Sequence, residues 1–365
     1  MELNRERRSL LWLSLAEITA DRVDRLCAQY GSATAVWEMF GQTGVLSAQS
    51  EANAVLARFH SDEALSRVLE NCVRQDIRIL FREDACYPAL LGCINDPPYL
   101  LYCKGDLAAL RRSCVSIVGT RYPSAYGRDM ARSLAFGLAK AGLCVVSGMA
   151  RGIDACAHEG ALSADSQTIA VLGCGVNVPY PPENAELYRR ILETGGLIIS
   201  EYPLGAQPMT FHFPHRNRVI SGLSAGLIFV EGRIKSGGML TVGTALEQGR
   251  EVFAVPGRVG QETSEGPHAI LREGARIVTS ATDVLEDLGV QPVGVLEAVP
   301  AAPDADASPL QKRVVKELRR EPLSLDELCA CTGAAADELM VELSEMEILG
   351  RVRREGGNRF SLSLR

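Results

Sequence analysis

Short apolar segments alternate with helical patterns from Asp76 to Leu288, and this alternation restricts the fold more than any other feature of the chain. The predicted strands are Ile77–Phe81, Val115–Val118, Cys144–Ser147, Thr168–Leu172, Leu197–Ser200, Leu227–Val230 and Val252–Val255. The predicted helices are Ala125–Ala141, Asp154–Leu162, Glu183–Leu192, Arg216–Leu223 and Met239–Gln248. Continuous apolar strands are typical of parallel sheets that are covered on both faces. We therefore predict an α/β core over residues 73–289, with a doubly wound parallel sheet and right-handed crossovers.

Residues 1–72 show a helical pattern instead. Their apolar residues recur at helix-like spacing, at Leu10, Leu11, Leu13, Leu15, Ile18, Val23, Leu26 and Val36. Asp21 and Ser32 are expected to be helix N-caps. The pattern predicts a small helical module of the SAM-like or helix-hairpin-helix-like kind, and a plain helical cap fits it equally well.

The C-terminal part divides into a linker and a compact module. Residues 290–307 hold Pro292, Pro300 and Pro303 among alanine, valine and acidic residues, without periodicity, which is typical of a linker. Residues 308–365 follow, with helices predicted at Pro309–Arg320, Ser324–Thr332 and Ala335–Leu349 and then two short strands around a Gly-Gly-Asn turn. Three helices and a hairpin predict a winged-helix domain.

The cysteines and the start of the chain indicate a protein of the reducing cytoplasm. Eleven cysteines are scattered without the regular spacing of a disulfide framework, and an oxidising compartment would threaten that many thiols. The charged first residues and the short apolar run Leu10–Leu15 predict neither a signal peptide nor a membrane span.

The net charge of −7 does not exclude a nucleic-acid partner. Six acidic residues and no basic residue lie between Ala281 and Asp306, at Asp283, Glu286, Asp287, Glu297, Asp304 and Asp306. The rest of the chain is nearly balanced in charge, which leaves room for a local basic groove.

Two turns at predicted strand ends have the composition of phosphate-binding loops. Gly119, Thr120 and Arg121 follow one strand and offer close backbone approach, a hydroxyl and a guanidinium fork. A solvated arginine at a strand exit fits the same turn.

The second turn is longer, and it lies between a strand and a helix. It comprises Ser147, Gly148, Met149, Ala150, Arg151, Gly152, Ile153 and Asp154. Its glycines allow an anion nest of backbone N–H groups at the helix start, and a tight structural turn with Asp154 as a helix cap is the alternative.

Two further segments carry basic residues at predicted helix starts. Arg216, Asn217 and Arg218 open one helix after Phe213, and one of the two arginines is expected to pair with a carboxylate such as Glu201 or Glu231. Lys235, Ser236, Gly237 and Gly238 lead into the next helix, whose N-terminus suits an anion. Because loops at the ends of parallel strands meet at one edge of a sheet, we expect these segments to hold a polyphosphate together.

Several kinds of chemistry lack support. The loops match neither a Walker A sequence nor the Gly-x-Gly-x-x-Gly dinucleotide fingerprint, so ATP hydrolysis and a nicotinamide cofactor are disfavoured. His212 and His215 have no third ligand in view, and Ser147, Asp154 and His158 lack the nucleophile elbow of a hydrolase. We expect no metal, no cofactor and no catalytic residues.

In combination, these segments resemble the DprA/Smf family of bacterial DNA-processing proteins. The resemblance rests on Tyr87–Leu91, Asp96–Tyr102, Gly105–Asp106, Ser116–Arg121, Ser147–Asp154, Tyr180–Asn184, Ser200–Gly205, Phe213–Ser224, Lys235–Thr241 and Glu251–Gly257, in this order. Met149 departs from the family pattern, which usually has a small residue there.

The resemblance implies an extended Rossmann-like core that binds single-stranded DNA, forms a homodimer, protects incoming strands and delivers them to RecA recombinase during natural transformation. It places Arg121, the loop 147–154, Arg216, Arg218 and Lys235 in the strand-binding pocket. The alternative is a LOG-like nucleotide N-glycosidase or phosphoribohydrolase, for which Glu247 would be the catalytic candidate. A transcription regulator acting through the C-terminal wing is a third hypothesis, which the acidic helices of that module disfavour.

Overall fold

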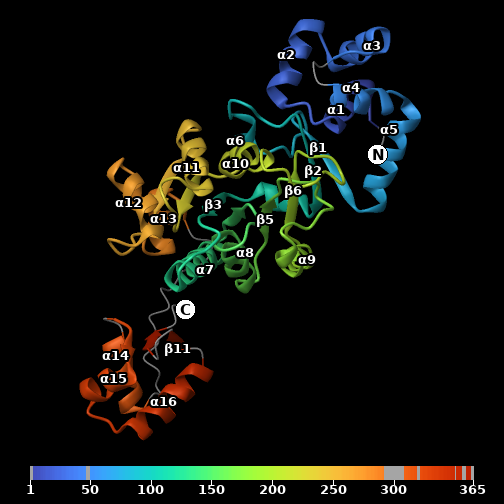
Figure 1. Cartoon of the computed structure of the whole chain (residues 1–365). Helices are drawn as coiled ribbons and strands as arrows, with labels where there is room; N and C mark the ends of the chain where they lie inside the picture. The colour runs from blue at the N-terminus through green and yellow to red at the C-terminus, as the bar shows by residue number, and fades with distance from the viewer. Residues whose placement is uncertain are drawn as a thin grey trace. The chain divides into compact units, whose positions relative to one another are not determined.

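The computed structural model describes residues 3–46, 50–291, 308–318, 321–349, 351–355 and 359–362. The chain divides into two compact units, Met1–Val293 and Gly294–Arg365 (Figure 1). The helical segment at the N-terminus and the sheet belong to the same unit, and the division proposed at residue 72 remains a prediction. Most of the predicted linker, residues 292–307, lies outside the described residues.

The described part of the first unit is built on a nine-stranded sheet with strand order β1-β2-β6-β5-β4-β3-β7-β8-β9. The strands are β1 (Ile77–Phe81), β2 (Leu100–Gly105), β3 (Cys114–Val118), β4 (Cys144–Ser147), β5 (Thr168–Val171), β6 (Leu197–Ser200), β7 (Gly226–Phe229), β8 (Glu251–Ala254) and β9 (Arg276–Ile277). Pairing is parallel from β6 to β9 and antiparallel for β1–β2 and β2–β6. The predicted doubly wound α/β sheet is confirmed, and β2 and β9 are additions to it.

The strand order creates a crevice at the carboxyl edge of the sheet. From β3 the chain moves outward through β4, β5 and β6, and it then returns to place β7 on the other side of β3. The connections that follow β3 and β7 therefore lead away to opposite sides. Such a switch point leaves room for a ligand beside the strand ends.

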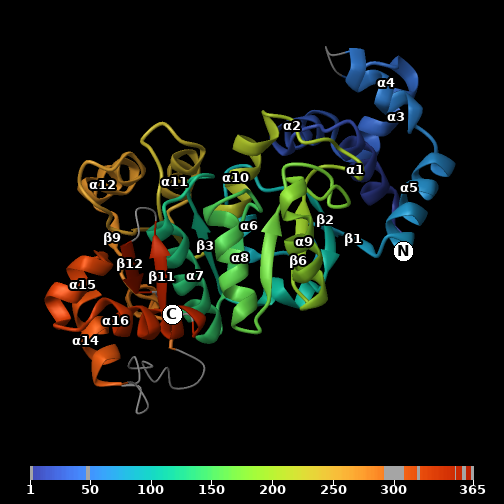
Figure 2. The same ribbon diagram turned by 60° about the horizontal axis from the view of Figure 1, so that its bottom comes forward.

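Helices cover both faces of this sheet (Figure 2). They are α6 (Ala89–Gly92), α7 (Ala125–Lys140), α8 (Ile153–Ser163), α9 (Ala185–Glu193), α10 (His212–Gly222), α11 (Gly237–Glu247), α12 (Glu265–Arg272) and α13 (Ala281–Asp287). Side chains of β5 alternate between two apolar cores: Ala170 packs in the core that includes α8 and α9, whereas Ile169 and Val171 pack in the core that includes α6, α10, α11 and α12. This alternation explains why the strand is apolar on both faces.

Five short helices precede the sheet: α1 (Arg5–Leu15), α2 (Ala20–Tyr30), α3 (Ala33–Thr43), α4 (Ser50–Arg58) and α5 (Asp62–Arg74). Trp12 is fully buried at their centre, 5.0 Å from Trp37 and 5.1 Å from Phe40 between ring centroids. The predicted cap at Ser32 is confirmed, because its side chain accepts from Ala35 N. The predicted cap at Asp21 is wrong, since the N-cap position is Thr19, two residues earlier, and Asp21 lies in the first turn of α2.

These helices pack directly on the antiparallel edge of the sheet. The Tyr99 hydroxyl donates to Ile18 O at 3.0 Å, and the hydroxyls of Ser14 and Tyr102 lie 2.7 Å apart. Both tyrosines are buried and belong to the same apolar core as Trp12. The loop between α1 and α2 is therefore fixed against the sheet.

The second unit contains α14 (Pro309–Leu318), β10 (Leu323–Ser324), α15 (Leu325–Thr332), α16 (Ala336–Ile348), β11 (Val352–Glu355) and β12 (Arg359–Leu362). Its strands pair in the order β10-β12-β11 around a core that includes Leu328, Leu343 and Phe360. The predicted winged-helix fold is confirmed. The predicted Gly-Gly-Asn turn lies outside the described residues.

Candidate single-strand-binding groove

Two adjoining hollows lie at the carboxyl edge of the sheet, with volumes of about 130 and 450 Å³. They share the wall residues Arg121, Tyr122, Ala150, Phe213 and Arg216. Other wall residues are Gly119, Thr120, Gly148, Arg151, Asp154, Leu172, Gly173, Cys174, Tyr180, Asn217, Ser236, Gly237 and Gly238. We call the two hollows together the carboxyl-edge groove. Its walls come from the loops after β3, β4, β5 and β7 and from α10, as the switch-point topology predicts.

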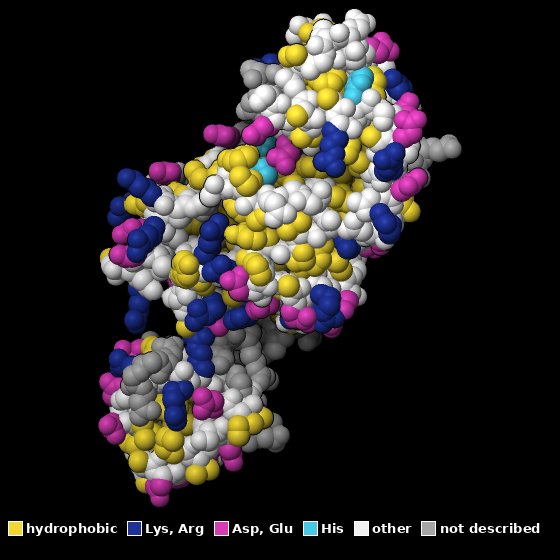
Figure 3. All heavy atoms as spheres, turned by 45° about the vertical axis from the view of Figure 1, so that its right-hand side comes forward, with side chains coloured by type: hydrophobic (Ala, Val, Ile, Leu, Met, Phe, Trp, Pro, Cys, Tyr) yellow, Lys and Arg dark blue, Asp and Glu magenta, His cyan; other side chains and the backbone are white. Residues whose placement is uncertain are grey.

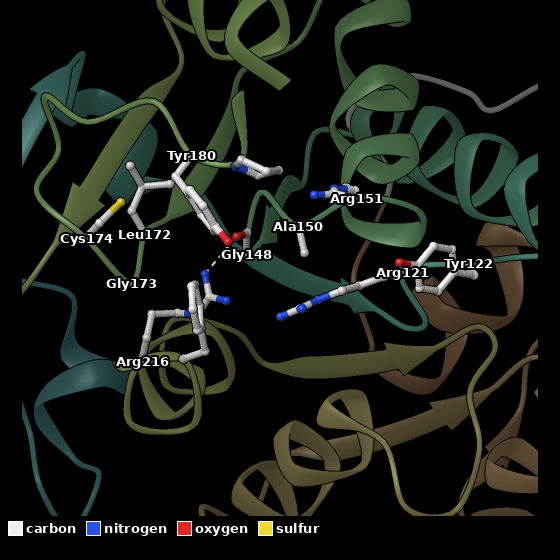
Figure 4. Close-up of a pocket in the computed structure, with 12 residues that line it drawn as sticks. Arg121, Tyr122, Gly148, Ala150, Arg151, Leu172, Gly173, Cys174, Tyr180 and Arg216 are labelled. Carbon is white, nitrogen blue, oxygen red and sulfur yellow. Dashed lines mark hydrogen bonds between the residues drawn. The ribbon is translucent and has the colours of Figure 1, made fainter. Parts of the chain in front are cut away.

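Arg216 forms the floor of this groove. Arg216 is only 5% exposed, and its Nη1 donates to Gly148 O at 2.8 Å (Figure 4). The same nitrogen also donates to Val171 O. A Cβ on Gly148 would lie 2.7 Å from both terminal nitrogens of Arg216. A larger residue at position 148 would therefore displace the guanidinium of Arg216 from its backbone acceptors.

The position of Arg216 in its helix differs from the prediction. Helix α10 begins at His212, so that the two arginines lie in its second turn and do not open the helix. At that depth, two residues that are two apart point in very different directions. Of the two arginines of α10, only Arg216 reaches the groove.

Asp154 lies beneath the groove and holds the loop after β4. Its Oδ2 accepts from Gly148 N at 3.1 Å and from Ala150 N at 3.3 Å. These two N–H groups are therefore already used and do not contribute to the expected anion nest, which otherwise stays a prediction. Burial raises the pKa of Asp154, and the positive charge of Arg216 acts against that shift. Asp154 is thus the buried counter-charge of Arg216.

Arg121 supplies a second guanidinium from the opposite wall. It is exposed, and Figure 4 shows it extending toward Arg216. The turn behind it is fixed, since Thr120 N donates to Glu231 O at 2.7 Å and Ile153 N donates to Thr120 O at 3.2 Å. Burial lowers the pKa of Arg216, and the charge of Arg121 adds to that shift. Two like charges therefore face one cavity, and an anion between them would relieve their repulsion.

Aromatic rings complete the walls of the groove. The Cζ atoms of Arg121 and Arg216 lie 5.8 and 6.0 Å from the centroid of Phe213, whose ring is 5.8 Å from that of Tyr180. The loop that carries Tyr180 also has a structural role. Its Asn184 does support the loop after β4, by donating to Met149 O at 2.8 Å. In the sequence, the position of Phe213 shortly before Arg216 is the feature that could have indicated that its ring lies in the groove wall.

The N-terminus of α11 lies in the wall of the larger hollow. Ser236 caps this helix by accepting from Met239 N, and Gly237 and Gly238 form its first turn. A Cβ on Gly238 would lie 2.6 Å from the ring of Phe229, so the helix start packs closely on β7. The positive end of the helix dipole therefore faces the groove. Lys235 is exposed in the preceding loop and lines neither hollow.

Three other predicted site residues direct their side chains elsewhere. Ser147 Oγ donates to Ile117 O at 2.7 Å, and Met149, at φ 60°, is fully buried in the apolar core. Arg218 pairs with Glu201 at 2.6 Å and with Asp96 at 3.1 Å. The expectation that one of the two arginines has a carboxylate partner is confirmed for Arg218. Gly152, at φ 78°, shapes the turn, and Arg151 pairs with Glu183 at 3.0 Å at the rim.

His158 is buried in α8 and gives the stability of the first unit a pH dependence. Its Nδ1 lies 2.8 Å from Thr168 Oγ1, and burial, with a further contribution from the charge of Arg216, lowers its pKa to about 3. The unfolded chain takes up this proton near pH 6.5. Stability is therefore fully present above pH 6.5 and falls toward pH 3, by up to ~1.4 kcal/mol per pH unit.

We expect His158→Gln to flatten this part of the stability profile. Urea unfolding between pH 7.5 and 4.5 would be followed by tryptophan fluorescence, because the two tryptophans, Trp12 and Trp37, both lie in the first unit. His268→Gln is the matched control, since that ring is only half-buried. An unchanged slope in His158→Gln would contradict the assignment.

The described residues contain no group of three or more His, Cys, Asp or Glu side chains suited to a metal ion. All eleven cysteines, which lie within the described ranges, are free thiols. Among the described helices, none has the length and apolar character that a membrane crossing requires.

Comparisons with known proteins agree with this geometry. Residues 78–289 match the family model for DNA recombination-mediator protein A, and residues 298–358 match the DprA winged-helix domain. The chain is 39% identical to protein Smf of Escherichia coli over 272 residues, which cover 72% of each chain. The structure of DNA processing protein A from Streptococcus pneumoniae superposes with a TM-score of 0.66 and 34% identity, over 79% of this chain and 99% of that one.

A further match is a structure titled for the single-stranded DNA binding mode of DNA processing protein A from Helicobacter pylori. It has a TM-score of 0.53 and 32% identity, over 59% of this chain and 97% of that one. Together with the family-model matches, these similarities show that the chain belongs to the DprA/Smf family of DNA-processing proteins.

Proposed function

We propose that this protein binds single-stranded DNA in the carboxyl-edge groove, protects incoming strands and loads RecA recombinase on them during natural transformation. We also propose that it acts in the cytoplasm as a homodimer through its Rossmann-like core, without catalysing a reaction. The observation that carries the proposal is the convergence of Arg121 and Arg216 on one cavity with aromatic walls.

The charges and rings of the groove suit different parts of a nucleotide. Two guanidinium groups and the N-terminus of α11 suit phosphates, because each offers donors and positive charge to an anion. The rings of Phe213, Tyr180 and Tyr122 offer faces for unpaired bases. Figure 3 shows one face of the molecule where hydrophobic side chains gather across the first unit with Lys and Arg side chains beside them. In a duplex the bases are stacked inside, so the aromatic walls favour a single strand.

The relatives support the same assignment. The Helicobacter pylori protein is described by its single-stranded DNA binding mode, and the family model is named for recombination mediation. The wall residues of this chain give these descriptions a physical basis, because guanidinium groups bind phosphates and aromatic rings stack on bases of any sequence.

The hydrolase alternative has no favouring observation in the groove. Glu247, its catalytic candidate, is the last residue of α11, is exposed and lines neither hollow. Asp154, the acidic residue that does line the groove, already accepts two backbone hydrogen bonds. A general base needs access to the substrate, which Glu247 does not have from this position.

Binding of labelled oligothymidine and of a duplex of equal length, each at two salt concentrations, tests the proposal. We expect the single strand to bind more tightly, with an affinity that falls steeply as salt rises, by a slope of about −0.7 for each phosphate neutralised. RecA filament formation on the same strand, with and without this protein, tests loading. Equal affinity for both forms of DNA would contradict single-strand selectivity.

A further inference from the structure

A second pocket lies where the N-terminal helices meet the sheet. We call it the junction pocket; it has a volume of about 220 Å³ and is lined by the loop between α1 and α2, by β2, by the loop after β6 and by the start of α10. Its side chains combine aromatic rings with carboxylates, notably Phe211, Tyr202, His212, Glu17 and Glu201. None of these residues lines the carboxyl-edge groove.

One short turn separates this pocket from the groove. Thr210 and Phe213 line the larger hollow of the groove, whereas Phe211 and His212, between them in sequence, line the junction pocket. The turn is closed by a hydrogen bond from His212 N to Met209 O at 3.0 Å. The junction pocket therefore lies within one short turn of the groove.

The rings of the junction pocket offer a stacking surface. His212 is fixed between Tyr202, stacked on it at 3.8 Å, and Phe211, edge-on at 4.5 Å. Phe211 is 64% exposed, although it belongs to a supported aromatic cluster. An exposed, immobilised ring is the feature that proteins use to stack an unpaired base.

One carboxylate oxygen of the pocket lacks a hydrogen-bond donor in the described part of the chain. Glu201 Oε1 pairs with Arg218, but its buried Oε2 has no hydrogen-bond partner among the described residues, and His215 Nδ1 is 3.7 Å away. A buried acceptor without a donor costs free energy, which a ligand with an N–H group would recover.

Glu17 adds a second carboxylate to the pocket, and its backbone adopts a left-handed conformation that is unfavourable for a residue other than glycine. It follows the end of α1 with φ 52°, where glycine is the usual residue, and its Oε2 lies 3.1 Å from His212 Nε2. Asp165 occupies the equivalent position after α8, also at φ 52°, but it is exposed and lines neither the groove nor the junction pocket.

We propose that the junction pocket takes a base of the bound strand, stacked on Phe211 with its donor edge toward Glu201 and Glu17, and that it prefers guanine. Guanine carries a ring N–H and an amino group side by side, whereas thymine presents one N–H between two carbonyl oxygens that carboxylates repel. Cytosine and adenine each offer a single amino group. This inference rests on the proposed function, since it requires a strand in the carboxyl-edge groove.

The test compares labelled oligothymidine with the same strand carrying scattered guanines or inosines, using fluorescence anisotropy on the full chain. We expect the guanine strand to bind at least about fivefold more tightly than oligothymidine, as for a base read by two hydrogen bonds. Inosine lacks the amino group and is expected to fall between them.

Substitutions assign the preference to the pocket. Glu17→Gly suits the backbone and is expected to abolish most of the guanine preference without weakening oligothymidine binding. Asp165→Gly makes the same backbone change elsewhere and should retain the preference. Glu201→Gln offers an amide donor toward the base and should also abolish it; thermal melting checks that each variant is folded.

The outcomes separate the two proposals. Equal affinity of the wild type for all three strands, with binding still dependent on Arg121, would overturn the guanine pocket and leave the proposed function standing. A guanine preference that persists in both glutamate variants would also overturn it. Absence of oligothymidine binding would instead contradict the proposed function itself.

Discussion

Replacing Arg121 by alanine is expected to weaken binding of oligothymidine by about tenfold to hundredfold at moderate salt. Hydrogen bonds to a charged partner contribute ~1.5–3 kcal/mol, and the exposed guanidinium of Arg121 is available for such bonds without breaking a buried contact. The dependence of log affinity on log salt should become shallower by about 0.7, because one phosphate is no longer neutralised. Anisotropy titrations at several salt concentrations measure both effects.

Two further substitutions make this experiment specific. Lys235→Ala is expected to have a smaller effect than Arg121→Ala, because Lys235 lies outside both hollows. Arg74→Ala removes an exposed arginine at the end of α5 that lines neither hollow, and it should leave affinity nearly unchanged. If all three variants lost affinity equally, general charge rather than the groove would account for binding.

Replacing Arg216 by methionine is expected to destabilise the first unit by ~3–5 kcal/mol near pH 7. The change removes the donors to Gly148 O and Val171 O and leaves the Asp154 carboxylate buried without its counter-charge. Urea unfolding followed by the fluorescence of Trp12 and Trp37 measures the loss.

The pH dependence of this loss identifies its cause. Burial already raises the pKa of Asp154, and removing Arg216 raises it further. A carboxyl group with a raised folded-state pKa takes up a proton more readily in the folded state, so the variant regains stability as the pH falls toward about 4. The deficit should therefore be largest above neutral pH.

The double variant Arg216→Met, Asp154→Asn separates charge from packing. We expect it to be more stable than Arg216→Met alone, since no buried charge is left without a partner. The result that would contradict this account is a double variant whose loss equals the sum of the two single losses.

The sheet was predictable because its strands are buried on both faces and therefore carry continuous apolar runs, as in β4 and β5. β9 escaped prediction because it is two residues long and both are exposed. The groove loops were predictable from glycine and arginine at strand ends. The sequence could not show which arginine of α10 faces the groove, because Glu201 and Asp96, which come from distant segments, hold Arg218 away from it.

The role of Gly148 also could not come from local sequence. The glycine is needed because of a guanidinium 68 residues later, and it is not at a positive φ. Likewise, Phe213 and Tyr180 lie in separate segments without a regular spacing of aromatic residues, so their proximity is visible only in the folded chain. Long-range packing, rather than local propensity, set these parts of the site.

The placement of β7 beside β3 has a consequence for synthesis of the protein. The groove walls extend in sequence from Val118 to Thr241, and the register of Val115 with Gly226 fixes where the last wall segment joins the first. A growing chain on the ribosome that has not yet added β7 has no complete groove. The affinity for DNA that we propose therefore arises late, after more than half of the polypeptide has been made.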